Sequence, residues 1–244
     1  MRPPLALLAL SALAAVASAQ DWPCWRGAEG DGVAKSGAWS PAGRRLWSAE
    51  VGLGFSSAAV VGERLYTLGF DAESRENSVL CLSADTGALL WKSSYPGVRR
   101  GADRHDGGTL STPAVSGERV YATSSEGWLR ALDRTTGALL WARAVAQEVG
   151  TAPDEYGFSA SPLVHEDLVL VCMDRVVGLD ARTGEIRWRS EPVGVDHSTP
   201  ALFTLQGRAH LAAFGKERLS VLDPAAGREL FAFPWHEEIG RAHV

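Results

Sequence analysis

One pattern occurs four times along this chain of 244 residues. In each copy a hydrophobic segment is followed by a short turn that contains Gly, and the turn leads into a second hydrophobic run that ends in Trp or Phe. The copies are 82–91, 132–141, 179–188 and 222–231. Their glycines, Gly87, Gly137, Gly184 and Gly227, lie 50, 47 and 43 positions apart. A recurrence at this spacing is typical of stacked supersecondary units rather than of one unique core.

Each unit divides into four short segments with the composition of β-strands. The first segment follows a Ser/Thr motif, and Pro is tolerated there because the first residue of a strand needs no ladder donor. The third segment ends at the Gly turn, where Asp caps the turn and Gly supplies the positive φ. A β-sandwich would show irregular strand spacing and no recurrent Trp. We therefore predict an all-β fold, a β-propeller of four-stranded antiparallel blades with about four blades present.

The N-terminus has the composition of a secretory signal peptide, which we predict over residues 1–19. Arg2 supplies a positive charge, 5–16 is an apolar run, and 17–19 reads Ala-Ser-Ala, a pattern that signal peptidase accepts. A membrane anchor needs roughly 20 apolar residues, so we expect no transmembrane segment. No Cys follows the predicted cleavage site directly, which argues against a lipid anchor. The sequence thus predicts an exported protein, periplasmic or extracellular.

The net charge bears on possible partners, and the positions of the cysteines bear on whether they are buried. The net charge is −5 and the predicted pI is about 5.7. The chain thus lacks the overall basic charge that would suggest binding to nucleic acid. The chain has three cysteines. Cys81 and Cys172 fall in predicted strands, where a free Cys behaves as a small hydrophobe, and we expect both to be buried. Cys24 lies outside the repeats, and the sequence does not assign its state.

The phrase Leu-Asp-x-x-Thr-Gly-x-x-x-Trp, in register with the Ser-x-Pro motif, resembles the pyrroloquinoline-quinone (PQQ)-like propeller repeat family. This family includes PQQ-dependent dehydrogenases and exported propellers that resemble an outer-membrane assembly factor. The resemblance covers about residues 46–235 and implies a ring of about eight blades. It also implies that Trp91, Trp141 and Trp188 dock between neighbouring blades, together with the glycines of the turns, as structural residues. The fourth unit departs from the family pattern, because Phe231 replaces Trp.

The segments that flank the repeats carry separate expectations. Residues 20–45 resemble the opening of a subgroup of exported propellers, and we expect them to form an N-terminal cap on one face of the ring. Trp47 and its neighbours look like an isolated last strand that completes the final blade, with the other strands supplied by missing C-terminal blades. The tail 236–244 matches no strand pattern. Residues 239–244 have the sequence that one reading frame of a common sequencing adapter encodes, which is consistent with an adapter origin for this part. The alternative is a genuine polar tail. We expect the chain to be the first half of a longer protein.

The family resemblance makes a PQQ-dependent dehydrogenase the leading enzyme hypothesis. Such enzymes hold the quinone and a Ca²⁺ ion at the ring axis with a carboxylate base, Asn and Glu ligands, and an adjacent Cys pair. This chain has no adjacent Cys pair, and its single Asn, Asn77, is expected in a polar loop. We therefore predict no catalytic, cofactor-binding or metal-binding residues and no cofactor. PQQ with calcium is expected only if the alternative function holds.

The polar connection 99–108 is the strongest candidate for a ligand site. Its Arg104, His105 and Asp106 could contact an anionic group, although a solvated loop has the same composition. His197 lies at the equivalent place in a later unit, and 154–157 lies at that place between them. Since the connections into successive blades converge around the axis, we name Arg104, His105, Asp106 and His197 as candidates for a shared ligand-binding rim.

The sequence as a whole favours an exported PQQ-like propeller that acts as a non-catalytic binding or assembly scaffold. Its loops would face a protein or glycan partner, and nucleic acid is not expected. The alternative is the N-terminal half of a PQQ-dependent dehydrogenase.

Overall fold

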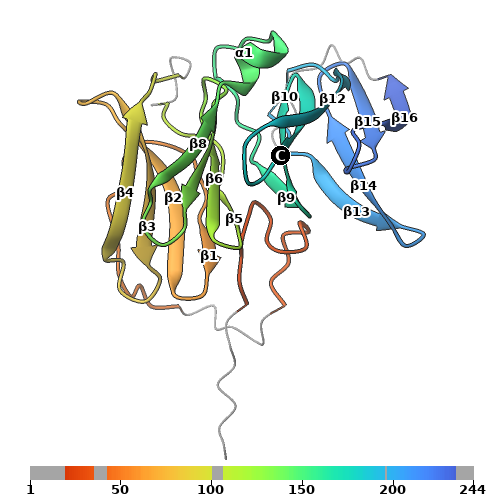
Figure 1. Cartoon of the computed structure of the whole chain (residues 1–244). Helices are drawn as coiled ribbons and strands as arrows, with labels where there is room; N and C mark the ends of the chain where they lie inside the picture. Colours follow the sequence, from red (N-terminus) through yellow and green to blue (C-terminus); the bar gives the residue numbers. More distant parts are fainter. Residues whose placement is uncertain (1–19, 36–42, 101–106, 196, 235–244) are drawn as a thin grey trace, which may run out of the picture.

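The computed structural model describes residues 20–35, 43–100, 107–195 and 197–234. Within these residues the chain forms sixteen strands in four separate sheets of four strands each, and every pairing inside a sheet is antiparallel between consecutive strands. Figure 1 shows the sheets side by side in chain order, from β1–β4 at the left to β13–β16 at the right. The predicted all-β architecture of propeller blades is confirmed. The predicted signal peptide and the predicted tail lie outside the described residues.

The four sheets are numbered here as blades 1 to 4. Blade 1 contains β1 (Ala59–Val61), β2 (Arg64–Asp71), β3 (Glu76–Ser83) and β4 (Leu89–Pro96). Blade 2 contains β5 (Ala114–Ser116), β6 (Arg119–Thr123), β7 (Leu129–Asp133) and β8 (Leu139–Arg143). Blade 3 contains β9 (Leu163–His165), β10 (Leu168–Met173), β11 (Arg175–Asp180) and β12 (Ile186–Pro192). Blade 4 contains β13 (Ala201–Leu205), β14 (Arg208–Phe214), β15 (Arg218–Leu222) and β16 (Glu229–Pro234).

Within the described residues, one helix interrupts this pattern. Helix α1 (Val145–Val149) lies in the connection between β8 and β9, and it ends at Gly150 in the left-handed conformation with φ 75°. Glycine adopts this conformation without a Cβ penalty, which allows the chain to leave the helix abruptly. Among the described residues, no helix is both long and apolar enough to cross a membrane.

The turns between the third and fourth strands are held by side-chain caps. Asp133 Oδ1 accepts two backbone N–H groups of the turn that follows it, and Asp180 and Asp223 do the same in blades 3 and 4. Ser83 takes this place in blade 1. The Arg187 guanidinium and the backbone N–H groups hold the pKa of Asp180 far below its usual range. The predicted role of Asp in these turns is therefore confirmed.

Each of these turns also receives an indole from the preceding blade. A Cβ atom added at Gly137 would lie 2.5 Å from Trp91 Cε3, so only Gly permits this contact. The same pairing joins Trp47 to Gly87, Trp141 to Gly184 and Trp188 to Gly227. The indole N–H groups of Trp47, Trp91 and Trp141 donate to the carbonyls of Ala84, Arg134 and Ala181 at 2.9, 3.1 and 3.3 Å. A flat indole thus closes the wedge between two twisted sheets, and in these three cases its N–H group is also paired. The buried Nε1 group of Trp188 has no acceptor among the described residues.

Trp47 shows that a blade position precedes blade 1. Its ring packs on Gly87 as Trp91 packs on Gly137, although Trp47 belongs to none of the four sheets. A single bridge between Leu53 and Phe70 joins its segment to blade 1. The residues around Trp47 therefore occupy the place of an outermost strand, on the side of blade 1 that faces away from blade 2.

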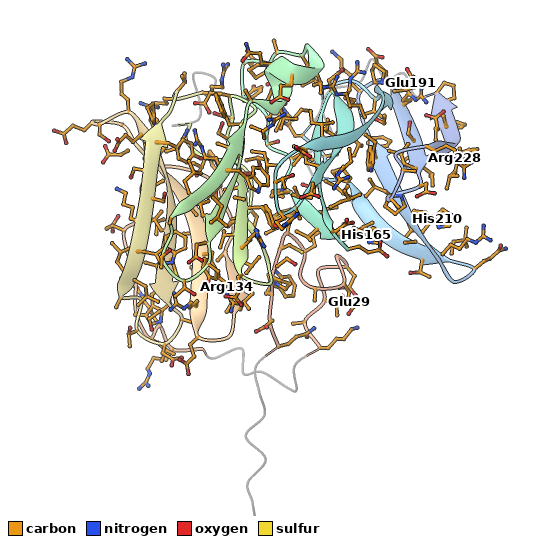
Figure 2. All side chains as sticks on the ribbon, in the orientation of Figure 1. Glu29, Arg134, His165, Glu191, His210 and Arg228 are labelled. Atoms are coloured by element: carbon orange, nitrogen blue, oxygen red, sulfur yellow. The ribbon has the colours of Figure 1, made fainter. Side chains whose placement is uncertain are left out.

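The hydrophobic core is divided among the spaces between blades. One cluster joins blades 1 and 2, a second joins blades 2 and 3, and a third joins blades 3 and 4. Figure 2 shows side chains filling the spaces between neighbouring sheets. Tyr66 and Tyr121 are among the largest fully buried side chains, and their hydroxyls donate to the turn carbonyls of Arg134 and Ala181. Burial raises the pKa of Tyr66 to about 12. The stability of each blade therefore depends on its neighbour.

A chain of hydrogen bonds links the innermost strands of the four blades. Ser57, Thr112, Ser161 and Thr199 occupy the same place just before the first strand of their blades. The backbone N–H groups of the first three donate to the hydroxyls of the next residue in this series, at 3.3, 2.9 and 2.9 Å. The sequence motif by itself predicts only a strand start that tolerates Pro. The structure shows that its hydroxyl also joins one blade to the next.

This chain of hydrogen bonds predicts the effect of Ser161→Ala. The substitution leaves the buried N–H group of Thr112 without an acceptor, and we expect the free energy of unfolding to fall by about 1 to 3 kcal/mol. Ser161→Thr is the matched control, because Thr112 and Thr199 already supply the hydroxyl from a Thr side chain. Urea unfolding followed by circular dichroism measures both variants. Equal losses for the two variants would contradict the role of the hydroxyl.

The N-terminal segment lies along the inner strands of the first two blades. Trp22 and Val60 exchange two backbone hydrogen bonds of 2.7 and 2.8 Å, and the Pro23 carbonyl accepts the N–H of Val115 at 2.8 Å. Asp21 Oδ1 accepts the N–H of Gly62 in the β1–β2 turn. These contacts tie the segment to β1 and β5, on the lower side of the molecule in Figure 1.

Candidate functional site

The candidate site lies in the connections that lead from one blade into the next. Helix α1, in the β8–β9 connection, lies at the top of the molecule in Figure 1. Glu191, near the end of β12, also lies on the upper side, whereas His165 at the end of β9 and Glu29 of the N-terminal segment lie on the lower side (Figure 2). The chain therefore enters β9 from the upper side, opposite the N-terminal segment. Connections of this kind carry function more often than the strands that hold them.

The side chain of Asp154, in the β8–β9 connection, is fixed by the backbone of residues that follow it. Its Oδ1 atom accepts the N–H groups of Tyr156 at 2.9 Å and Gly157 at 3.0 Å, which is an Asx turn. Gly157 has φ 91°, and a Cβ atom there would lie 2.6 Å from the Cβ of Ser125. The glycine thus allows the turn to pack tightly on blade 2. This arrangement holds the second carboxylate oxygen, Oδ2, in a constant direction.

His197, in the β12–β13 connection, lies next to that oxygen. The distance between His197 Nε2 and Asp154 Oδ2 is 3.5 Å, and the side chains are 35% and 34% exposed. The other ring nitrogen, Nδ1, lies 2.8 Å from Ser159 Oγ. The Tyr156 ring meets the imidazole edge to face, with centroids 5.8 Å apart. We call Asp154, Tyr156, Ser159 and His197 the rim cluster.

A third connection reaches the rim cluster through Arg100. This residue follows β4, and its Nη1 group donates to the backbone carbonyl of Asp154 at 3.3 Å. Its Nε group is buried and has no acceptor within the part of the chain that the structure describes. The connections that leave blades 1, 2 and 3 therefore meet at one place, which offers a carboxylate, an imidazole, a phenol, a hydroxyl and a guanidinium.

The structure describes some of the rim candidates that the sequence suggested, and others lie outside the described residues. His197 and the segment 154–157 come together, as the convergence of the connections suggested. Arg104, His105 and Asp106 lie outside the described residues and stay predictions. Ser159 was missed, because the sequence gives it no signal beyond its place two residues before Ser161. Only the folded path of the two connections brings it to His197.

The described residues do not fit a PQQ and calcium site. Asn77 was expected in a polar loop, but it lies within β3, is 2% exposed and packs against Gly97. The reason is the length of the first hairpin, in which β2 and β3 each have eight residues and pair through Phe70 with Asn77 to Asp71 with Glu76. The cysteines lie apart, in the N-terminal segment, β3 and β10. Within the described ranges, no group of three or more His, Cys, Asp or Glu side chains is arranged to hold a metal ion.

Solved structures with the same fold include proteins of two kinds. BamB from Moraxella catarrhalis is 22% identical with a TM-score of 0.51, and the match covers 72% of this chain and 47% of that one. Quinohemoprotein alcohol dehydrogenase from Comamonas testosteroni is 15% identical with a TM-score of 0.63, over 89% of this chain and 42% of that one. The dehydrogenase ADHIIG from Pseudomonas putida HK5 is 16% identical with a TM-score of 0.55, over 76% and 34%. The chain spans less than half the length of each, and at these identities the likeness shows the fold alone.

The family of the chain is identified by comparison of its sequence. No curated protein matches the chain. The sequence profile described as outer membrane protein assembly factor BamB matches residues 35–151 and, in a second placement, 75–243. Together the two placements include all four blades. The chain therefore belongs to the family of PQQ-like repeat propellers that this profile describes.

Proposed function

We propose that the protein is an exported binding and assembly scaffold whose upper face holds a protein partner. The observation that carries this proposal is the rim cluster, which Arg100 of a third connection also contacts, and in which the side chains of Asp154 and His197 are about one-third exposed. Tyr and Arg side chains supply much of the binding energy in protein interfaces, and Tyr156 and Arg100 both lie there.

The composition of the blades supports this assignment. The repeated Trp, Gly, Ser and Thr residues contact the neighbouring blade, so the repeats themselves are occupied in holding the blades together. Side chains for a partner must then come from the connections, which a rigid scaffold positions. Membership in a family described by an assembly factor supports a protein partner, and the predicted signal peptide supports export.

Photo-cross-linking tests the proposal in the cells that make the protein. A photoreactive amino acid replaces Glu155, an exposed residue of the upper face, and in a control it replaces Glu63, an exposed residue of the β1–β2 turn. We expect a specific adduct with another envelope protein from position 155 and none from position 63. No adduct from position 155, or equal adducts from both, would contradict the proposal. Dye reduction by the purified protein with PQQ and Ca²⁺ would instead favour the dehydrogenase hypothesis.

A further inference from the structure

Three side chains of the rim cluster form a continuous line of polar contacts. Ser159 Oγ lies 2.8 Å from His197 Nδ1, and His197 Nε2 lies 3.5 Å from Asp154 Oδ2. The first distance is that of a good hydrogen bond, and the second is slightly longer than a normal hydrogen bond, as catalytic contacts often are before a substrate binds. A hydroxyl, an imidazole and a carboxylate in this order are the parts of an activated nucleophile.

The carboxylate decides which imidazole nitrogen carries the proton. A carboxylate only accepts hydrogen bonds, so it favours the tautomer with the proton on Nε2. The Nδ1 lone pair then faces Ser159 and accepts the hydroxyl proton. Among the described residues, the Ser159 hydroxyl has one other acceptor, the His197 carbonyl, but that contact is 3.5 Å long and far weaker than the contact of 2.8 Å. The hydroxyl therefore donates to the imidazole.

The orientation of each group is fixed by a separate contact. Asp154 uses Oδ1 to accept two backbone N–H groups, which leaves Oδ2 for His197. Tyr156 packs against the imidazole and limits its rotation. Such support of the base by a third residue and its surroundings distinguishes a pre-organised site from a chance contact.

We propose that Ser159 is a nucleophile that hydrolyses small carboxylic esters, with His197 as its general base and Asp154 as a positioning residue. Oγ forms a bond to the ester carbonyl carbon while its proton passes to Nδ1. That proton passes to the departing alkoxide oxygen as the ester C–O bond breaks, which leaves an acyl group on Ser159. Water then attacks the acyl carbon, gives a proton to Nδ1, and the proton returns to Oγ as the acid leaves. This activity goes beyond the binding role proposed above.

The backbone beside Ser159 can supply donors for the developing oxyanion. Among the described residues, no hydrogen bond uses the N–H group of Ser159 or that of Ala160. The N–H group of the nucleophile itself is a common member of an oxyanion hole. Ser159 is half-buried, so a small ester can reach it whereas a bulky one is hindered.

A fluorophosphonate probe at neutral pH tests the proposal on the purified protein. The probe phosphonylates activated serines, with fluoride as the leaving group, and we expect one adduct, on the peptide that contains Ser159. Ser159→Ala should abolish the adduct, and His197→Gln should slow labelling at least a hundredfold. Ser94→Ala is the matched control, since the Ser94 hydroxyl pairs with the Ser78 hydroxyl at 2.9 Å and with no imidazole in the described part of the chain, and labelling should be unchanged.

Asp154→Asn separates a positioning role from a structural one. The Asn oxygen can still accept both backbone N–H groups, so the turn should survive, but the amide N–H₂ then faces Nε2 and favours the unproductive tautomer. The same exchange in serine hydrolases lowers turnover by about 10⁴, and here we expect labelling to slow at least tenfold with an unchanged unfolding midpoint. Absence of labelling in the folded wild-type protein, or labelling that persists in Ser159→Ala, would overturn the proposal. Cross-linking at Glu155 does not depend on the Ser159 hydroxyl, so the two proposals can fail separately.

Discussion

Trp91→Ala is expected to lower the free energy of unfolding by about 3 to 5 kcal/mol, the cost of truncating a large aromatic side chain in a core. Trp91 is 9% exposed, packs on Gly137 of the next blade and lies 6.0 Å from the ring of Tyr66. Its removal leaves a cavity between blades 1 and 2 and also leaves the Arg134 carbonyl without its indole donor. Urea unfolding followed by tryptophan fluorescence and circular dichroism measures the loss.

Two variants show whether the loss comes from the contact between blades. Trp25→Ala removes an indole that is 41% exposed in the N-terminal segment, and we expect a loss of less than about 1 kcal/mol. Trp91→Phe keeps an aromatic ring but removes the hydrogen bond to the Arg134 carbonyl, so its loss should lie between those of the two alanine variants. A Trp91→Ala protein as stable as the wild type would show that the indole does not hold the blades together.

The repeats could be predicted because one geometric unit is built four times. The spacing of Gly87, Gly137, Gly184 and Gly227 indicates a blade that is repeated along the chain. Asp side chains before these turns, such as Asp133 and Asp180, indicate a cap that forms within the turn and needs no distant partner. Spacing alone does not tell which unit receives which indole. The family resemblance implies only that the indoles dock between neighbouring blades, and the structure places Trp91 on the turn of the following blade.

Features that depend on the next blade were harder to predict. The hydroxyls of Thr112 and Ser161 act on a backbone N–H group of another unit, so their role is invisible in a single repeat. Asn77 was misplaced because the first hairpin is longer than a repeat-based boundary suggests. The local sequence marks strand and turn composition, but it does not report how far two strands continue to pair.

The rim cluster lies between these cases. His197 and the segment 154–157 were placed near each other by their position before successive blades, which needs only the fold. Ser159 could not be singled out, since its contact with His197 depends on the path of two connections that follow no repeat pattern. For a site built from connections, the sequence therefore predicts where the site lies but not which residues form it.

Gly137→Ala is expected to destabilise the protein by about 2 to 6 kcal/mol, for two separable reasons. Gly137 has φ 74°, and a side chain in this region costs about 1 to 3 kcal/mol. The new methyl group would also lie 2.5 Å from Trp91 Cε3, which forces the indole or the turn to move at a further cost of about 1 to 3 kcal/mol. Chemical unfolding under the conditions used for Trp91→Ala measures the sum.

Gly117→Ala isolates the first of these costs. Gly117 also has a positive φ, 54°, but nothing lies within 4 Å of an added Cβ atom, so its substitution should show the backbone cost alone. In the Trp91→Ala background the indole is absent, and Gly137→Ala should then cost no more than Gly117→Ala. A double-mutant cycle between positions 91 and 137 therefore measures the steric coupling between two neighbouring blades. A coupling energy near zero would contradict the indole–glycine contact as the element that sets the distance between blades.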